Sequence, residues 1–238
     1  MARKGKLSEV TTIASIERPP RSRKYTYYIL IVCEDESTEP DYFARYKQRF
    51  LDILPKETVY LRPIGSGRNS LGVVEYAKAE RDKLFEESGK EIDQTWAVFD
   101  KDDLDKTKGN RANFEKAFCE ANVSNIQIAY SNECFELWFL LHFEDVDATE
   151  GLPRKNIYKR LEDAIKREVD PNFEYKHGDS SIVDIIWQNG DQKKAIIRAQ
   201  GLNKYHTDNQ TDPINANPNT LVYRLVKELE SWYSYYIY

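Results

Sequence analysis

The hydrophobic positions of this 238-residue chain form short apolar runs separated by longer amphipathic stretches. Four of these runs read as β-strands: Tyr27–Cys33, Glu57–Ile64, Thr95–Asp100 and Asn125–Ser131. The first run is uninterrupted and rich in β-branched and aromatic residues, which is typical of a parallel strand covered on both faces. It therefore predicts a buried strand near the start of the domain.

An amphipathic or apolar helical stretch follows each predicted strand. The expected helices cover Thr38 to about Leu51, Ser70 to about Glu87, Asn110–Ala121 and Glu133–Phe143. Thr38 and Ser70 are the expected N-caps of the first two, because hydroxyl side chains accept hydrogen bonds from the first free N–H groups of a helix. Strands that alternate with helices through short connections predict an α/β fold class, with a mostly parallel, Rossmann-like sheet flanked by helices.

The pattern changes beyond about Asp145, where no further strand is expected. Helices are predicted over Lys155–Glu168, Ser180–Gln188 and Gln192–Leu202, and a last one from Leu221 onwards; His206–Asn219 reads as a polar, proline-broken loop. The chain is thus expected to have three parts. These are a basic arm of residues 1–24, an α/β core of residues 25–145 and a mainly helical part of residues 146–238 packed on the core.

Length and composition are compatible with a large α/β domain, because 40% of the residues are hydrophobic and 32% are charged. Cys33, Cys119 and Cys134 lie in or beside apolar segments without paired spacing, so neither a disulfide framework nor a zinc site is expected. The first ten residues lack the apolar segment of a signal peptide, and no run of about 18 apolar residues occurs. These features predict a cytoplasmic protein without a membrane segment.

Charge is unevenly distributed, although the formal net charge is only −5. Residues 1–24 contain seven lysines and arginines against two glutamates, whereas the rest of the chain is acidic. A basic arm on an acidic body is a candidate contact for nucleic-acid phosphates, although a solvated terminus is the favoured interpretation of residues 1–15. The candidate contacts are Arg18, Arg21, Arg23 and Lys24, together with Arg68.

Arg68 belongs to a glycine-rich loop, Gly65–Ser70, that follows the second predicted strand. The loop lacks the spacing of either standard phosphate-loop pattern. A turn is therefore favoured over a phosphate cradle.

Acidic side chains follow the first and third predicted strands at the point where each strand ends. Glu34 follows the first strand, and Asp100, Asp102 and Asp103 follow the third. Ligands of open α/β sheets bind at the carboxyl ends of strands, and adjacent strands lie ~5 Å apart, so these groups could share one cation. Carboxylates are the ligands that Mg²⁺ prefers, and paired metal ions drive phosphodiester hydrolysis. Alternatively, Glu34 and its neighbours have no functional role and are acidic residues near the start of a helix, where the positive end of the helix dipole favours them.

The Asp-x-Asp spacing alone is weak evidence. It also occurs in sugar-nucleotide transferases and in phosphatases of the haloacid-dehalogenase type. Leu104 stands where those phosphatases have threonine or valine, which counts against them. A glutamate after the first strand combined with Asp-x-Asp after the third is more specific.

Three stretches carry a resemblance to a known family: ILIVCEDESTEPDYF (29–43), WAVFDKDD (96–103) and SNECFELWFLLHF (131–143). With the weaker NPNTLVYRLVKEL (217–229), they resemble the RloB-like family, whose core resembles the Toprim domain of topoisomerases, primases and OLD-type nucleases. Two positions depart from the family pattern. Asp35 replaces the usual glycine, which could alter how closely the turn approaches a metal, and Glu133 replaces the usual proline of a Ser-Asn-Pro triplet.

The resemblance implies a Toprim-like fold and a role in bacterial defence against phage, next to an ABC-type or AAA-type ATPase partner. Toprim relatives in comparable systems are nucleases, including nucleases of transfer RNA. If the roles of the family's motif residues hold at the matching positions, Glu34 would be the general base or a ligand of Mg²⁺ or Mn²⁺. Asp100 and Asp102 would be metal ligands, and Asp103 a possible third.

The resemblance also implies a further catalytic glutamate, because OLD-type nucleases have a Ser-x-Glu element and a lysine as general acid. Ser131-Asn132-Glu133 has that spacing, but Glu133 occupies the family's proline position, so Glu136 is the preferred candidate. Lys176 is the candidate acid, in competition with Lys193 and Lys194. His142 is interpreted as a hydrogen-bonding histidine of the fold.

Three functions are compatible with these residues. The first is a metal-dependent phosphodiesterase, an endonuclease acting on RNA or DNA. The second is a non-catalytic module of the same fold that binds nucleic acid or the ATPase. The third is a phosphotransferase or phosphatase with Asp100 as nucleophile.

Overall fold

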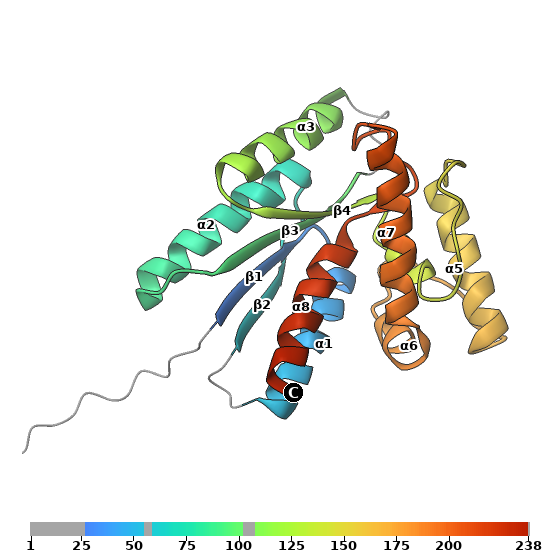
Figure 1. Ribbon diagram of the computed structural model, residues 1–238, viewed down its shortest axis with the longest axis horizontal. Helices are drawn as coiled ribbons and strands as arrows, with labels where there is room; N and C mark the ends of the chain where they lie inside the picture. Colours follow the sequence, from blue (N-terminus) through green and yellow to red (C-terminus); the bar gives the residue numbers. More distant parts are fainter. Residues whose placement is uncertain (1–26, 55–58, 102–107, 238) are drawn as a thin grey trace, which may run out of the picture.

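The computed structural model describes residues 27–54, 59–101 and 108–237, which form an α/β fold (Figure 1). One sheet contains β1 (Tyr27–Cys33), β2 (Val59–Gly65), β3 (Gln94–Asp100), β4 (Gln127–Asn132) and β5 (Asn219–Thr220), in the order β2-β1-β3-β4-β5. The first four strands are parallel, and β5 pairs antiparallel with β4. The predicted fold class, a mostly parallel sheet flanked by helices, is confirmed.

Strand β1 is a buried interior strand of the sheet, because it pairs with β2 on one side and β3 on the other. Residues 29–33 of β1 have no exposed surface. Complete burial of a large aliphatic side chain contributes about 1.5–3 kcal/mol, so this run anchors the core. The pairing of Cys33 with Val98 brings the ends of β1 and β3 side by side.

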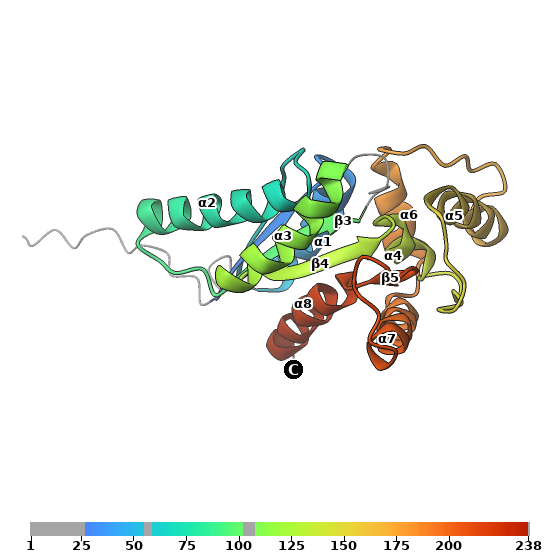
Figure 2. The same ribbon diagram turned by 90° about the horizontal axis from the view of Figure 1, so that it is seen from above.

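The helices cover both faces of the sheet and one end of it. They are α1 (Thr38–Ile53), α2 (Ser70–Ser88), α3 (Lys108–Val123), α4 (Glu136–Leu140), α5 (Arg154–Glu168), α6 (Ser181–Asn189), α7 (Gln192–Asp208) and α8 (Val222–Ile237). Helices α2 and α3 lie on one side of the sheet and α8 on the other, with α1 beside α8 (Figures 1 and 2). Helices α5, α6 and α7 gather beyond the sheet, on one side of the molecule (Figure 1).

Strand β5 corrects the expectation that no strand occurs after Asp145. Its two residues lie in or beside the predicted polar loop and join the sheet by pairing with β4. Thr220 lies opposite Ser131, and the hydroxyl oxygens of the two side chains are 2.9 Å apart. The N–H of Leu221 continues the pairing to the carbonyl of Tyr130. A strand this short has no hydrophobic periodicity, so only its tertiary partner specifies it. The division of the chain into parts at residues 24 and 145 stays a prediction.

Helix α4 is shorter than the predicted helix Glu133–Phe143. Its flanks are tighter turns, in which Leu137 N–H bonds to the carbonyl of Cys134 and Phe143 N–H to that of Leu140. Glu133 stays outside the helix because its carboxylate accepts hydrogen bonds from other segments.

Helix α7 is longer than predicted: it continues past Leu202 to Asp208, and its added turns include the buried His206. The predicted loop from His206 therefore begins only after Asp208.

The two predicted N-caps are also displaced. Thr38 and Ser70 are the first helical residues, and the capping carboxylate and amide come from Asp35 and Asn69, which accept hydrogen bonds from Thr38 N–H (2.8 Å) and Gly72 N–H (3.0 Å).

Within the described ranges, no helix is long and apolar enough to cross a membrane.

Candidate functional site

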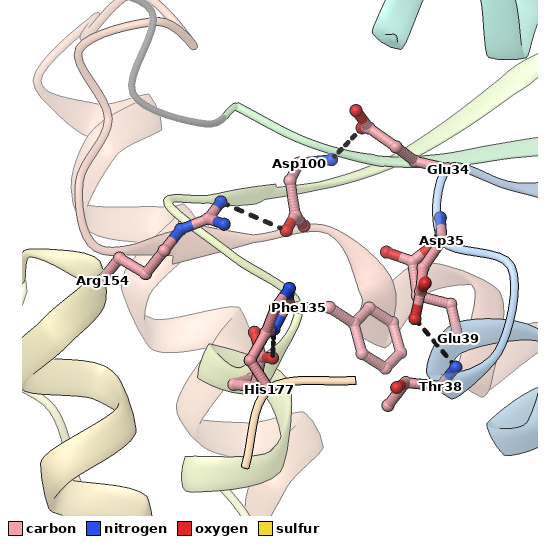
Figure 3. Close-up of a pocket in the computed structure, with 9 residues that line it drawn as sticks. Glu34, Asp35, Thr38, Glu39, Asp100, Phe135, Arg154 and His177 are labelled. Atoms are coloured by element: carbon pink, nitrogen blue, oxygen red, sulfur yellow. Dashed lines mark hydrogen bonds and ion pairs between the residues drawn. The ribbon is translucent and has the colours of Figure 1, made fainter. Parts of the chain in front are cut away.

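An acidic pocket lies where β1 and β3 end (Figure 3). Its volume is about 260 Å³. It is lined by residues that follow β1, the last residue of β3, residues at the starts of α1, α4 and α5, and one residue of the loop before α6: Glu34, Asp35, Thr38, Glu39, Asp100, Phe135, Glu136, Arg154 and His177. Five of these side chains are carboxylates, which face the cations of Arg154 and, when protonated, His177.

Glu34 and Asp100 meet at the carboxyl edge of the sheet, as expected for residues that end neighbouring parallel strands. The N–H of Glu34 bonds to the carbonyl of Val98 at 2.9 Å, and the N–H of Asp100 donates to Oε2 of Glu34 at 2.9 Å. The side chain of Asp100 is 17% exposed. Its Oδ1 is nevertheless buried and has no hydrogen-bond partner among the described residues.

Burial and mutual repulsion act on this carboxylate cluster. Burial, followed by the charges of Glu39, Glu136 and Glu34, raises the pKa of Asp100 well above its ordinary value, and Arg154 opposes that rise only in part. Burial and the charge of Glu34 likewise raise the pKa of Glu39, which is 3% exposed. Desolvation disfavours a carboxylate, and so does a neighbouring like charge, so a cation bound here would stabilise the charged forms.

Asp35 holds the turn after β1 through hydrogen bonds. Its carboxylate accepts hydrogen bonds from the N–H groups of Thr38 (2.8 Å) and Glu36 (2.7 Å), and so caps α1. Its own N–H donates to Oε2 of Glu39 at 3.2 Å. The turn after β1 is therefore held by its own acidic side chains.

The glycine-rich loop after β2 supports the same turn. Gly67 N–H donates to the carbonyl of Glu34 at 2.9 Å, and the Ser66 hydroxyl donates to the carbonyl of Cys33 at 2.8 Å. A Cβ atom on Gly65 would lie 2.6 Å from the carbonyl oxygen of Asp35, so only glycine fits there. Exposed Arg68 lies over the ring of Tyr76 at 4.9 Å and does not line the pocket.

Glu136 enters the pocket from the start of α4 and is 5% exposed. It accepts hydrogen bonds from the hydroxyl of Tyr175 and from Nδ1 of His177, the latter at 3.3 Å. Burial alone would raise the pKa of Glu136, but the bonds from His177 and Tyr175 lower it below its ordinary value.

Glu133, the alternative glutamate, does not line the pocket. It accepts from Arg154 N–H at 3.1 Å and from Asn217 at 3.2 Å, and so holds the start of α5.

The candidate general acids lie away from the pocket lining. Lys176 is exposed and does not line the pocket, although its neighbour His177 does. Lys193 and Lys194 are at the start of α7, where Lys194 pairs with Asp191 at 3.3 Å.

His142 has the structural role that was expected. Its Nδ1 lies 2.9 Å from the carbonyl oxygen of Trp138, and burial lowers its pKa to about 4.

Sequence reasoning missed Arg154, His177 and the burial of Glu39. Nη2 of Arg154 lies 3.6 Å from Oδ2 of Asp100 (Figure 3). The same nitrogen donates to the carbonyl oxygen of Glu133 at 3.2 Å. Arg154 is the first residue of α5, one position before the predicted start, and His177 lies in a loop without a motif. For Glu39 the available signal was its position as the second residue of α1, within the first motif.

Several predicted site residues lie outside the described residues: Asp102, Asp103, Arg18, Arg21, Arg23 and Lys24. Among the residues that are described, no group of three His, Cys, Asp or Glu side chains is arranged to hold a metal ion. One feature of the pocket nevertheless suits a hard cation such as Mg²⁺, which prefers oxygen ligands. The buried Oδ1 of Asp100 has no hydrogen-bond partner within the described part of the chain, so it could serve as such a ligand.

Comparisons with known proteins place the chain in a family without adding a close relative. Searches of curated proteins and of solved structures found no match. The model of a family described as RloB-like protein matches residues 29–229. This match covers most of the chain and includes the strands, turns and helices that build the pocket, so the chain belongs to the RloB-like family.

Proposed function

We propose that this protein is a Toprim-type, Mg²⁺- or Mn²⁺-dependent nuclease that hydrolyses phosphodiester bonds of RNA, including transfer RNA, or of DNA. One observation carries the proposal: the carboxylate of Asp100 is held beside Glu34 with a buried Oδ1 that has no hydrogen-bond partner among the described residues. Leaving a buried acceptor unpaired costs about 1–3 kcal/mol, so such atoms call for a functional explanation. A bound cation provides one.

The residues that would hold the cation are Glu34 and Asp100, with Asp102 and Asp103 completing the set predicted from the sequence. When bound, a divalent cation lowers the pKa of a coordinated water and stabilises negative charge on phosphate oxygens. Raised carboxyl pKa values, as at Asp100 and Glu39, are typical of functional sites in clefts.

The remaining pocket residues suit a phosphate group. Arg154 presents its guanidinium at the pocket edge, held by the carbonyl of Glu133. A guanidinium binds phosphate oxygens through parallel N–H donors, so Arg154 would orient the scissile phosphate. Phe135 gives the pocket one apolar wall. Glu34, fixed by the backbone of Asp100, would accept the proton of the attacking water.

The biological setting follows from the family resemblance. We propose an effector of antiphage defence that is released or triggered by an ABC-type or AAA-type ATPase encoded nearby. Arg18, Arg21, Arg23 and Lys24 of the basic arm, with Arg68, would contact nucleic-acid phosphates.

The test is cleavage of transfer RNA, RNA oligonucleotides and single- and double-stranded DNA in Mn²⁺ or Mg²⁺, with and without the ATPase. Wild-type protein should cut at least one substrate, and Asp100→Asn should abolish cutting. Asp163→Asn is the matched control, because Asp163 lies exposed on α5 and pairs with Lys159. Wild-type rates in the Asp100→Asn protein would contradict the proposal.

A second candidate is a non-catalytic module of the same fold that binds nucleic acid or the ATPase. It is favoured by the lack, among the described residues, of a three-ligand metal group. This module would bind its partner equally well in EDTA and in Mn²⁺, and Asp100→Asn would leave binding unchanged. Binding without cleavage in every condition above would select it.

A further inference from the structure

His177 is the histidine that faces the pocket; His142 and His206 do not line it. It lies in the loop between α5 and α6, which is tied to α5 by a hydrogen bond of 3.0 Å from Tyr175 N–H to Glu162. Its ring stacks on Tyr158, with centroids 5.7 Å apart and planes 22° apart. An exposed side chain held this way loses rotamer freedom, so its position calls for a reason.

The two ring nitrogens of His177 have different surroundings. Nδ1 lies 3.3 Å from Oε1 of Glu136 and 3.3 Å from the hydroxyl of Tyr158. Nε2 has no hydrogen-bond partner among the described residues, and the side chain is 66% exposed. Glu136 and Tyr158 thus orient the ring through one nitrogen and leave the other available to a ligand.

The place of His177 in the pocket suits a substrate bound at Asp100. In the close-up, Glu34 and His177 lie on opposite sides of Asp100, and Arg154 approaches Asp100 from a third side (Figure 3). In-line displacement at phosphorus requires the attacking and leaving oxygens on opposite sides of the phosphorus atom. A phosphate oriented by Arg154 would therefore have Glu34 near one oxygen and His177 near the other.

We propose that His177 is a catalytic residue of the phosphodiester hydrolysis proposed above, in which its Nε2–H protonates the leaving oxygen. The water oxygen forms a bond to phosphorus, and its proton passes to Glu34. The bond from phosphorus to the leaving oxygen breaks, and that oxygen takes the proton of His177. The products are a phosphate monoester and an alcohol. Glu34 then releases its proton to solvent, and His177 regains one from solvent.

The charges around His177 favour its protonated form. The hydrogen bond to Glu136 raises the pKa of His177 above its ordinary value, against the effects of burial and of the Arg154 charge; Asp35 also raises it. Tyr175, Tyr158 and Cys134 are the other titratable groups beside it or beside Glu136, and burial raises the pKa of all three, so they stay neutral. A general acid must hold its proton at the working pH and lie within hydrogen-bond reach of the leaving atom.

A leaving-group substitution separates proton donation from simple positioning. The linkage cut by wild-type protein is first mapped on an oligonucleotide, and the leaving oxygen there is then replaced by sulfur. A thiolate leaves without a proton, so it does not need a general acid. We expect His177→Gln to cut the oxygen linkage about 10²-fold or more slowly, and the sulfur linkage within a few-fold of wild type. A thermal unfolding curve like that of wild type would show that the variant is folded.

The other outcomes overturn the inference in distinguishable ways. Equal slowing of both linkages by His177→Gln would make His177 a positioning or binding residue, and no slowing would exclude it from the reaction. If Lys176→Gln instead slowed only the oxygen linkage, the acid would be Lys176. These results leave the proposed function standing, provided that wild-type protein cuts and Asp100→Asn does not. A wild-type protein that cuts neither oligonucleotide overturns the proposed function and the role of His177 with it.

Discussion

The backbone N–H of Asp100 donates a hydrogen bond of 2.9 Å to Oε2 of Glu34. This bond joins the ends of β1 and β3, which are already linked by the bond from Glu34 N–H to the carbonyl of Val98. The main chain thus fixes the Glu34 carboxylate, while Oδ1 of Asp100 keeps no hydrogen-bond partner among the described residues. A cation bound between these carboxylates would find them oriented in advance, which lowers the cost of binding.

The first prediction is that divalent cations stabilise the protein through Asp100. At 100 times the dissociation constant, a ligand that binds only the folded state adds about 2.7 kcal/mol to the free energy of unfolding. For a chain of this length, we expect Mn²⁺ or Mg²⁺ to raise the melting temperature of wild type by several degrees. The shift should be absent in Asp100→Asn and retained in Asp163→Asn. Equal shifts in all three proteins would place cation binding elsewhere.

The second prediction is that the acidic cluster destabilises the metal-free fold. Burial, then the charge of Glu34, raises the pKa of Glu39 well above 4.5. The folded state then binds this proton more tightly than the unfolded state, so stability falls as pH rises from about 4.5 through the raised value. Glu39→Gln removes the charge but keeps an oxygen that can accept from Asp35 N–H. In EDTA at pH 8, we expect it to be more stable than wild type by about 0.5–2 kcal/mol.

Urea unfolding at pH 5 and pH 8 tests this second prediction. The advantage of Glu39→Gln over wild type should be larger at pH 8, where the carboxylate of wild type is forced towards its charged form. A variant that is less stable than wild type at pH 8 would show that the Glu39 charge is a net stabilising group.

Glu34 and Asp100 could be found from the sequence because each ends an apolar run. Parallel strands with crossover connections place such ends at one sheet edge, and the observed pairing of β1 with β3 makes them neighbours. Their surroundings could not be found in this way. Arg154 and His177 come from the part of the chain beyond Asp145, and only its packing on the core brings them to the pocket.

Local rules also failed where tertiary partners decide the conformation. Thr38 is a good N-cap by residue type, but it is the first residue of α1, and its own N–H donates to the carboxylate of Asp35. The two residues of β5 gain their extended form from β4. The apolar stretch after β4 predicts one long helix. Glu133 nevertheless lies outside α4, and its carboxylate accepts hydrogen bonds from Arg154 N–H at the start of α5 and from Asn217.

The third prediction concerns the turn that presents Glu34. A Cβ atom at Gly65 would lie 2.6 Å from both the carbonyl oxygen of Asp35 and Cα of Glu36, which are backbone atoms with little freedom to move. Gly65→Ala should therefore reduce stability by about 1–3 kcal/mol, and should also weaken the Mn²⁺ shift by displacing the turn.

Gly201→Ala is the matched control for this third prediction. Gly201 lies in α7, and an added Cβ would meet nothing within 4 Å. Alanine is about 1 kcal/mol more favourable than glycine in a helix, so this variant should be as stable as wild type or more so. If urea unfolding gave both variants the same stability, the close approach at Gly65 would have no energetic importance.

The fourth prediction is a pH dependence of stability that arises from His142. Burial lowers its pKa to about 4, from an ordinary value of 6.5. The unfolded chain therefore binds this proton below about pH 6.5, whereas the folded state excludes it until about pH 4. The contribution is complete above pH 6.5 and is lost as pH falls to 4. A depression of this size corresponds to about 3 kcal/mol in the free energy of unfolding.

His142→Gln should remove this part of the acid sensitivity. Chemical unfolding at pH 7, 6, 5 and 4 should show a smaller loss of stability in the variant than in wild type, with the difference growing steadily below pH 6.5. His177→Gln is the control, because the pKa of His177 is raised above 6.5. The contribution of His177 to the free energy of unfolding is therefore complete below pH 6.5 and is lost only as pH rises above that value. Parallel curves for wild type and His142→Gln would mean that the buried imidazole takes up its proton without disturbing the fold.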